Sequence, residues 1–233
     1  MNIGIVSLAA VPMRKEPSDR AEMVNQILFG ETFDVLEEQE KWTLVQLHHD
    51  AYQGWIDRKQ WDYASGIADV RNCNTALFEV IPENGRDRIL PMGALSSEYF
   101  LAETDPLHSL VDTARLFLDT PYLWGGRTFM GIDCSGFTQV VFRARGKYIL
   151  RDAYQQAEQG ERVELGDAAN GDLAFFANSS GRIIHVGILM VEDGETRIIH
   201  ASGKVRIDRL DKEGIYNEDT ASYSHQLHHL QRI

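Results

Sequence analysis

The sequence predicts an α+β fold, because short strands fill its first hundred residues and helices followed by antiparallel strands fill the rest. The segments GETFDVLEEQ, KWTLVQLHHD and QGWIDRKQW are strand-like, rich in aromatic and β-branched residues, and separated by turns. Such regularly spaced short strands are typical of a small barrel or sandwich, which we expect over residues 1–63. A second β-rich segment within residues 64–103 is too short for a barrel with its own core, so we expect it to lean on a neighbour.

The pattern changes at the start of a third unit, residues 104–233. TDPLHSLVDTARLFLDTP places apolar residues at helical spacing, with Asp105 as a candidate cap and Pro106 in the first turn. A second helix is expected to begin at about Cys134 and to stop at Gly146, and a third lies in RDAYQQAEQG. The segments GDLAFFA, RIIHVGILMV, ETRIIHASG and KVRIDRL then have the period of strands.

Composition limits the classes of partner. The 233 residues are 43% hydrophobic, which is enough for a real core in one or two domains. A net charge of −12 with no basic stripe argues against nucleic acid. Apolar runs are only a few residues long, and the N-terminus lacks the basic start, long apolar region and cleavage site of a signal peptide. We therefore expect a cytoplasmic protein without a membrane partner.

The chain has two cysteines, Cys73 and Cys134, which are too few for a disulfide framework or a zinc set. A single disulfide between them is a disfavoured alternative. Cys134 lies at the edge of the apolar helical pattern rather than inside it. Free N–H groups and the positive end of the helix dipole at such a position favour a thiolate, which is a nucleophile. The position fits equally well a half-buried cysteine that fills a gap between helix and sheet.

The segment RIIHVGILMVEDGETRIIHASG predicts a β-hairpin with Asp193 and Gly194 at its turn. Pairing about this turn places His200 opposite Gly187, and His185 shares the face of Gly187 because it is two residues away. The two histidines would then be diagonal neighbours on one face. A shift of the register by one residue would separate them.

One cysteine at a helix start and two histidines on one sheet face fit a nucleophile, a general base and a group that orients the base. In this interpretation they are Cys134, His185 and His200, respectively. One core histidine and one surface histidine is the ordinary alternative. A Cys/His/His metal site is a further alternative, although it lacks close ligand spacing and a fourth ligand. We expect the pairs His48–His49 and His228–His229 at the solvated surface.

These motifs together resemble the NlpC-type cell-wall peptidases, a papain-like family of cysteine peptidases. The resemblance rests on DCSGF opening a helix, HVGI on a strand and a polar residue on the next strand, supported by TPYLWGGRTFMGIDCSGF and GDLAFF. It covers about residues 106–208. The family cuts the γ-D-glutamyl bond to a diamino acid in peptidoglycan stem peptides. The resemblance implies the same three roles for Cys134, His185 and His200, and it implies no metal or cofactor.

The N-terminal segments RKEPSDRAEMVNQILFGE and DAYQGWI resemble the bacterial SH3-like domain of one branch of the family. This branch holds the γ-D-glutamyl-L-diamino acid endopeptidases, or dipeptidyl-peptidases VI. There the barrel closes one end of the groove and supplies an acid and a tyrosine that hold the free amine of an N-terminal L-alanine. The matching positions are Glu16 and Tyr52, which Asp133 joins, while Ser135 lines the same pocket. From composition alone, a solvated loop role for Glu16 and a core-covering role for Tyr52 stay open.

The segment RDA is similar to the family's Arg-Asp-Ser element, which contacts the D-glutamate carboxylate. Arg151 and Asp152 match it, whereas Ala153 departs from the serine. Trp124 and Tyr122 line the groove or pack beneath it.

The resemblance thus implies an endopeptidase that releases L-Ala-γ-D-Glu from murein peptides during recycling, through a thioester. The alternatives are a non-catalytic cell-wall peptide-binding protein, and an amidase or acyltransferase on the same scaffold. The second would need an open apolar groove.

Overall fold

The computed structural model describes residues 2–69, 72–83, 85–100, 108–192 and 194–233. The predicted cap at Asp105, the first-turn Pro106 and the predicted turn residue Asp193 lie outside these ranges. The predicted boundary at residue 104 does so as well.

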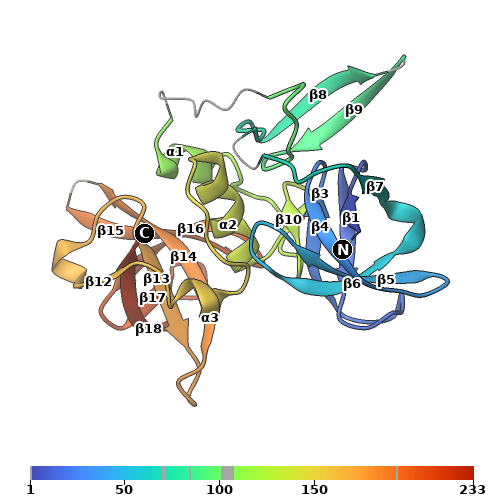
Figure 1. Cartoon of the computed structure of the whole chain (residues 1–233). Helices are drawn as coiled ribbons and strands as arrows, with labels where there is room; N and C mark the ends of the chain where they lie inside the picture. The colour runs from blue at the N-terminus through green and yellow to red at the C-terminus, as the bar shows by residue number, and fades with distance from the viewer. Residues whose placement is uncertain (1, 70–71, 84, 101–107, 193) are drawn as a thin grey trace.

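The N-terminal unit is a seven-stranded antiparallel sheet in the order β3-β2-β6-β5-β4-β1-β7 (Figure 1). Its strands alternate as the sequence predicts. In β5, for example, Thr43, Val45 and Leu47 are buried and the residues between them are not. The inward side chains join a core around Phe33 and Trp61, whose rings meet edge to face at 5.5 Å. The strands are β1 (Ile3–Ile5), β2 (Ala10–Arg14), β3 (Met23–Leu28), β4 (Thr32–Glu38), β5 (Trp42–Leu47), β6 (Gln53–Asp57) and β7 (Asp62–Ala64).

In the described part of the second β-rich segment the strands form one hairpin, β8 (Phe78–Glu83) and β9 (Arg86–Pro91), rather than a second barrel. It leans on the first unit, as expected for a piece without enough core of its own. Leu90 is fully buried in a small cluster that includes Phe29. The backbone N–H of Leu95 also donates to the Phe29 carbonyl at 2.7 Å.

Three short helices begin the C-terminal unit: α1 (Leu110–Arg115), α2 (Cys134–Ala144) and α3 (Ala153–Gln156). The predicted first helix is shorter than its apolar pattern. Ser109 caps it, with a reciprocal bond to Asp112, and turns follow Arg115. The cysteine helix begins at Cys134 as predicted, and every one of its side chains is buried. No helix in the described residues is long and apolar enough to cross a membrane.

The remaining strands form an antiparallel sheet that closes on itself, because β18 pairs with both β13 and β17. Figure 1 shows α2 between this sheet and the N-terminal unit, and the short β10 between α2 and the N-terminal unit. The sheet is β12 (Glu161–Val163), β13 (Leu173–Ala177), β14 (Ile183–Glu192), β15 (Glu195–Ser202), β16 (Lys204–Asp211), β17 (Gly214–Asn217) and β18 (Ser222–Arg232). The pair β10 (Arg127–Thr128) and β11 (Gly131–Ile132) leads into α2.

A buried charge cluster joins the two units. Glu31 accepts two hydrogen bonds from Arg127, both at 2.9 Å, and pairs with Arg143 of α2. Burial alone would raise the pKa of Glu31, but Arg127, His49 and Arg143 outweigh it and hold the pKa well below its usual range. A buried charge of this kind needs its partners, so docking of the barrel on α2 is part of the fold.

The expectation of a solvated His48–His49 pair is wrong. The side chain of His49 is only 5% exposed and lies 3.1 Å from Asp50 in this charge cluster. His48 is also largely buried, and its Nδ1 lies 2.9 Å from the Thr32 hydroxyl. His49 sits where the barrel meets α2, whereas His48 packs within the barrel against β4, and a local pattern indicates neither contact.

Candidate active site

Cys134 is the first residue of α2, and the preceding Asp133 is its N-cap. The Asp133 carboxylate accepts from the Gly136 N–H at 2.7 Å, which explains why the helix starts here. The thiol is buried but lines a cavity. Burial, and then the Asp133 charge, raise the pKa of Cys134 to about 12, against opposing hydrogen bonds from the backbones of Val186 and Ser135. Cys134 and Cys73 are both free thiols.

The two histidines share one face of the sheet, as the predicted register requires. Strands β14 and β15 pair from Glu192, which lies opposite Glu195, to Ile188, which lies opposite Ile199. Beyond its last pair, Nε2 of His185 lies 2.8 Å from Nδ1 of His200, with the rings nearly perpendicular. Gly187 makes this approach possible, because a Cβ there would lie 2.8 Å from the Cβ of His200.

The thiol and His185 are neighbours without a direct bond. The backbone of Val186, the residue after His185, lies close enough to Cys134 to lower the pKa of its thiol. Among the described residues, no hydrogen bond joins this thiol to the imidazole of His185. Contacts of this kind are often long in a free enzyme and tighten only when substrate is bound. Burial, with the charges of His200 and His225, lowers the pKa of His185 well below its ordinary value, so the ring is a neutral base.

Asp208 of β16 extends this chain of contacts and was missed in the sequence. Its Oδ2 lies 2.9 Å from Nε2 of His200, and Arg206 pairs with the same carboxylate at 2.8 Å. Burial would raise the pKa of Asp208, but the hydrogen bonds from His200 and Arg206 lower it overall. The signal was in the sequence: a turn at Gly203 pairs His200 with Arg206, and Asp208 lies two residues further on the same face.

An ionised Asp208 only accepts hydrogen bonds, so Nε2 of His200 carries a proton. When His200 is neutral, its Nδ1 therefore accepts from Nε2 of His185. This leaves Nδ1 of His185 without a proton and free to act as a base. Asp208 thus sets the tautomers of both histidines.

A third histidine packs on the base. The ring of His225 of β18 stacks on His185 with a centroid distance of 4.2 Å and an interplanar angle of 21°. Phe176 of β13 lies against the same imidazole at 5.7 Å. Burial, and then the charge of His200, lower the pKa of His225 to about 4, so it is neutral at pH 7. These contacts fix the plane of the His185 ring. His225 was not predicted, because only the closure of the sheet brings β18 to this place.

A cavity of about 750 Å³ lies in front of Cys134, within the size range of ligand sites. The barrel supplies one side of it, and the other wall residues come from the loop that holds Trp124, the start of α2, the start of α3 and the β13–β14 turn with the first residues of β14. Its walls are Lys15, Glu22, Val24, Tyr52, Gln53, Trp124, Asp133, Cys134, Ser135, Arg151, Asp152, Ala153, Tyr154, Asn178, Arg182, Ile183 and Ile184. Seven predicted site residues are among them, namely Tyr52, Trp124, Asp133, Cys134, Ser135, Arg151 and Asp152.

Asp133 and Arg151 form a buried ion pair with each other. Arg151 donates to both carboxylate oxygens, at 2.6 and 3.1 Å, and to the Ser135 hydroxyl at 2.9 Å. Asp133 also accepts from the N–H of Gly125 at 2.8 Å. Both charges are therefore already satisfied inside the protein. The roles of Asp133 at the substrate amine and of Arg151 at a carboxylate stay predictions, in which each group would contact the substrate while it keeps its internal partner.

Asp152 is the half-buried acid that stays open to the cavity. It caps α3, and its carboxylate lies 3.5 Å from the hydroxyl of Tyr52, across the barrel boundary. Burial raises the pKa of Asp152, and burial together with the charge of Asp152 raises the pKa of Tyr52. Among the described residues, no Lys or Arg forms an ion pair with Asp152. Ala153 follows as the first residue of α3 and offers no hydroxyl.

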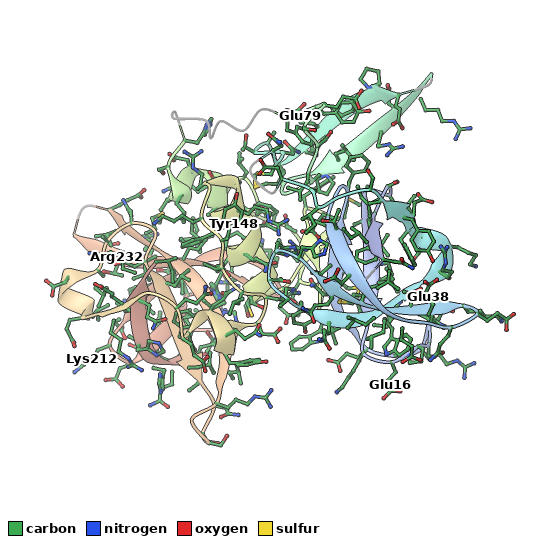
Figure 2. All side chains as sticks on the ribbon, viewed as in Figure 1. Glu16, Glu38, Glu79, Tyr148, Lys212 and Arg232 are labelled. Carbon is green, nitrogen blue, oxygen red and sulfur yellow. The ribbon has the colours of Figure 1, made fainter. Side chains whose placement is uncertain are left out.

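Glu16 does not line the cavity. It is exposed, and Figure 2 shows it below the barrel, away from the C-terminal unit. Glu22, at the other end of the same loop, lines the cavity instead and accepts from Nε1 of Trp124 at 2.8 Å. Trp124 is exposed above the cavity and Tyr122 is half-buried. Loop residues in the barrel face different directions, and the sequence similarity did not separate the two acids.

The described residues hold no group of three or more His, Cys, Asp or Glu side chains arranged for a metal ion. Of the C-terminal pair, His228 is exposed as expected, but His229 is half-buried and stacks on Phe175 at 5.1 Å.

Comparison with known proteins shows the family of the chain. Residues 119–223 match the NlpC/P60 family, and residues 13–60 match the bacterial dipeptidyl-peptidase Sh3 domain. The gamma-D-glutamyl-L-lysine dipeptidyl-peptidase of Bacillus subtilis is 32% identical over 76% of this chain and 71% of its own length. The chain belongs to the NlpC/P60 family. It is a cysteine peptidase with an N-terminal bacterial SH3 domain.

Other relatives cover most of the chain. Dipeptidyl-peptidase 6 of Lysinibacillus sphaericus is 26% identical over 95% of this chain and 97% of its own length. The crystal structure of an NlpC/P60 family protein from Bacillus cereus superposes with a TM-score of 0.78 over 99% of both chains, at 21% identity. The last comparison confirms the predicted α+β fold, in which an SH3-like sheet precedes a helix-plus-antiparallel-barrel domain.

Proposed function

We propose that this NlpC/P60 peptidase hydrolyses the γ-D-glutamyl–diamino acid bond of murein peptides that carry a free N-terminal L-alanine. It would release L-Ala-γ-D-Glu, in the recycling of cell-wall peptides in the cytoplasm. Two of its relatives are named as gamma-D-glutamyl-L-lysine dipeptidyl-peptidases, which supports the bond type. The wall that the barrel builds at one end of the cavity supports the preference for a short, free N-terminus.

The open carboxylate of Asp152 carries this proposal. Asp152 is half-buried, its neighbours are phenol hydroxyls, and within the described residues it has no ion-pair partner. A carboxylate in this environment favours binding of a cation in the cavity. The α-amine of an N-terminal L-alanine is such a cation, and its N–H groups would donate to Asp152 while the Tyr52 oxygen accepts. Glu22 also lies on the barrel side of this cavity, but Lys15 pairs with it at 3.7 Å, so Asp152 is the acid that the proposal uses.

The chemistry follows from the contacts of the three catalytic side chains. His185 takes the proton of the Cys134 thiol, and the sulfur attacks the γ-carbonyl of the D-glutamyl residue. The imidazolium returns the proton to the leaving amine of the diamino acid, which leaves a thioester on Cys134. Water, activated by His185, then hydrolyses the thioester and frees the dipeptide. The backbone N–H of Cys134, at the start of α2, would stabilise the oxyanion.

The cavity disfavours the alternative of a lipid amidase or acyltransferase. Such an enzyme needs an open apolar groove, whereas charged residues form much of this wall, among them Lys15, Glu22, Asp152 and Arg182. A purely binding role would not need a base held by the chain from His185 to Asp208.

Incubation with L-Ala-γ-D-Glu-meso-diaminopimelate tests the proposal. Mass spectrometry should detect L-Ala-γ-D-Glu and free diaminopimelate, and Cys134→Ala should release neither. Absence of the dipeptide with the wild-type protein, or equal release by Cys134→Ala, would exclude this function.

A further inference from the structure

A second cavity of about 380 Å³ adjoins the one at Cys134. The two cavities share three wall residues, Tyr154, Arg182 and Ile183. The rest of the second wall comes from the turn after α3 and from the strands β12 and β18, and no barrel residue contributes to it. It therefore continues the first cavity on the side away from the barrel.

The second cavity is basic in a chain whose net charge is −12. Its wall holds the guanidinium groups of Arg162 and Arg182 and one carboxylate, that of Glu158. His229 adds no charge at pH 7, because burial and then Arg162 lower its pKa to about 4. Within the described residues, neither Arg162 nor Arg182 forms an ion pair. Both side chains are exposed, so the fold does not depend on their charges.

The direction of the substrate decides what reaches this place. If the amine lies against Asp152 at the barrel side, the chain beyond the cleaved bond leaves Cys134 in the opposite direction. The wall of the first cavity away from the barrel includes Arg182 of the β13–β14 turn and Ile183, the first residue of β14. The part of the peptide that follows the cleaved bond carries carboxylates: the C-terminal one, and in some diamino acids one on the side chain.

We propose that the second cavity binds the carboxylate-bearing segment C-terminal to the cleaved bond, with Arg162 and Arg182 as its ligands. This inference rests on the proposed function, and it names the substrate part that the function leaves undefined. A guanidinium binds a carboxylate through two parallel N–H donors, which suits either source of the carboxylate.

Three peptides separate the sources: L-Ala-γ-D-Glu-L-Lys, its C-terminal amide, and the amide of L-Ala-γ-D-Glu-meso-diaminopimelate. We expect the wild type to cleave all three, with kcat/KM for the lysine amide about fivefold below that of at least one peptide that keeps a carboxylate. The difference should lie mainly in KM, because the contact is made equally before and during the reaction. Arg162→Gln and Arg182→Gln should each reduce this difference in kcat/KM between the peptides. Arg86→Gln, which deletes an exposed charge on the distant β8–β9 hairpin, is the control.

If kcat/KM is higher for L-Ala-γ-D-Glu-L-Lys than for its amide, the arginines bind the C-terminal carboxylate. If kcat/KM is higher for the diaminopimelate amide than for the lysine amide, they bind the carboxylate on the side chain. Equal kcat/KM values for all three peptides, or a difference that persists in both arginine variants, would overturn the inference and leave the proposed function intact. No cleavage of any peptide by the wild type would remove the proposed function and this inference together.

Discussion

Nε2 of His185 lies 2.8 Å from Nδ1 of His200, and the opposite nitrogen of His200 lies 2.9 Å from the carboxylate of Asp208. The three side chains come from three successive strands, β14, β15 and β16. The Asp208 carboxylate therefore does not contact the base His185. It acts on His185 by fixing the tautomer of His200, which lies between them.

Asp208→Ala should lower kcat by about ten- to a hundredfold with little change in KM, because His200 loses the acceptor that fixes its tautomer. Asp208→Asn should lose less, since its amide oxygen still accepts from Nε2 of His200. Steady-state kinetics on the tripeptide over a range of pH would show this order. Asp211→Asn, which removes a carboxylate on the surface of the same strand, is the matched control. Wild-type kcat and an unchanged pH profile in Asp208→Ala would contradict the assignment.

Acid should destabilise the protein before its carboxylates titrate. Four histidines have lowered pKa values in the folded state, namely His49, His185, His225 and His229. Between about pH 4 and 6.5 the unfolded chain binds protons at these positions and the folded chain does not, so stability falls as the pH decreases. Each fully buried histidine should contribute on the order of 1 kcal/mol between pH 7 and 5.

Urea unfolding at pH 7 and pH 5 measures this effect. We expect a lower midpoint at pH 5 with the same slope, and a smaller difference in His225→Phe, which keeps an aromatic ring against His185. A midpoint at pH 5 equal to or above that at pH 7 would show that these rings accept protons in the folded state.

Asp133→Asn should make Cys134 more reactive. The Asp133 carboxylate is one of the groups that raise the pKa of the thiol, and its removal also leaves the positive charge of Arg151 unbalanced nearby. Both changes stabilise the thiolate, so the pH at which alkylation reaches half its maximal rate should fall by about one to two units. Iodoacetamide labelling with peptide mass spectrometry reports Cys134 separately from Cys73. Asp152→Asn, which removes another acid of the same cavity, should shift the pH profile of alkylation less than Asp133→Asn does. If Asp133→Asn shifts the profile no further than Asp152→Asn, or shifts it to higher pH, the electrostatic explanation is refuted.

Glu31→Gln should destabilise the protein by about 3–5 kcal/mol, because it leaves the buried Arg127 and Arg143 without their counter-charge. Denaturant unfolding gives the value. Asp119→Asn breaks the exposed pair with Lys204 and should change stability by less than about 1 kcal/mol. A loss below about 1 kcal/mol in Glu31→Gln would mean that the charge cluster does not hold the barrel on α2.

The local parts of the site follow from sequence periodicity. The start of α2 at Cys134 and the pairing of His185 with His200 depend on a capping residue and on one short hairpin, so patterns over a few residues fix them. Asp208 follows from the same reasoning applied to the next turn, at Gly203.

The remaining parts depend on how distant segments dock. Glu16 and Glu22 flank one loop of the barrel, and the position of the barrel on α2 decides which of them faces Cys134. The burial of His49 and the stacking of His225 on His185 likewise depend on contacts between segments far apart in the chain. Periodicity along one segment carries no information about these contacts.

The central claim, recognition of a free N-terminal amine beside Asp152, is tested most directly by kcat/KM for L-Ala-γ-D-Glu-meso-diaminopimelate and for its N-acetyl derivative. The wild type should prefer the free amine by about a hundredfold or more, since the acetylated peptide leaves the half-buried Asp152 without a cation. Asp152→Asn should lose most of this preference, through slower cleavage of the free peptide, and should fold like the wild type. Equal kcat/KM values for the two peptides with the wild-type protein would contradict the account.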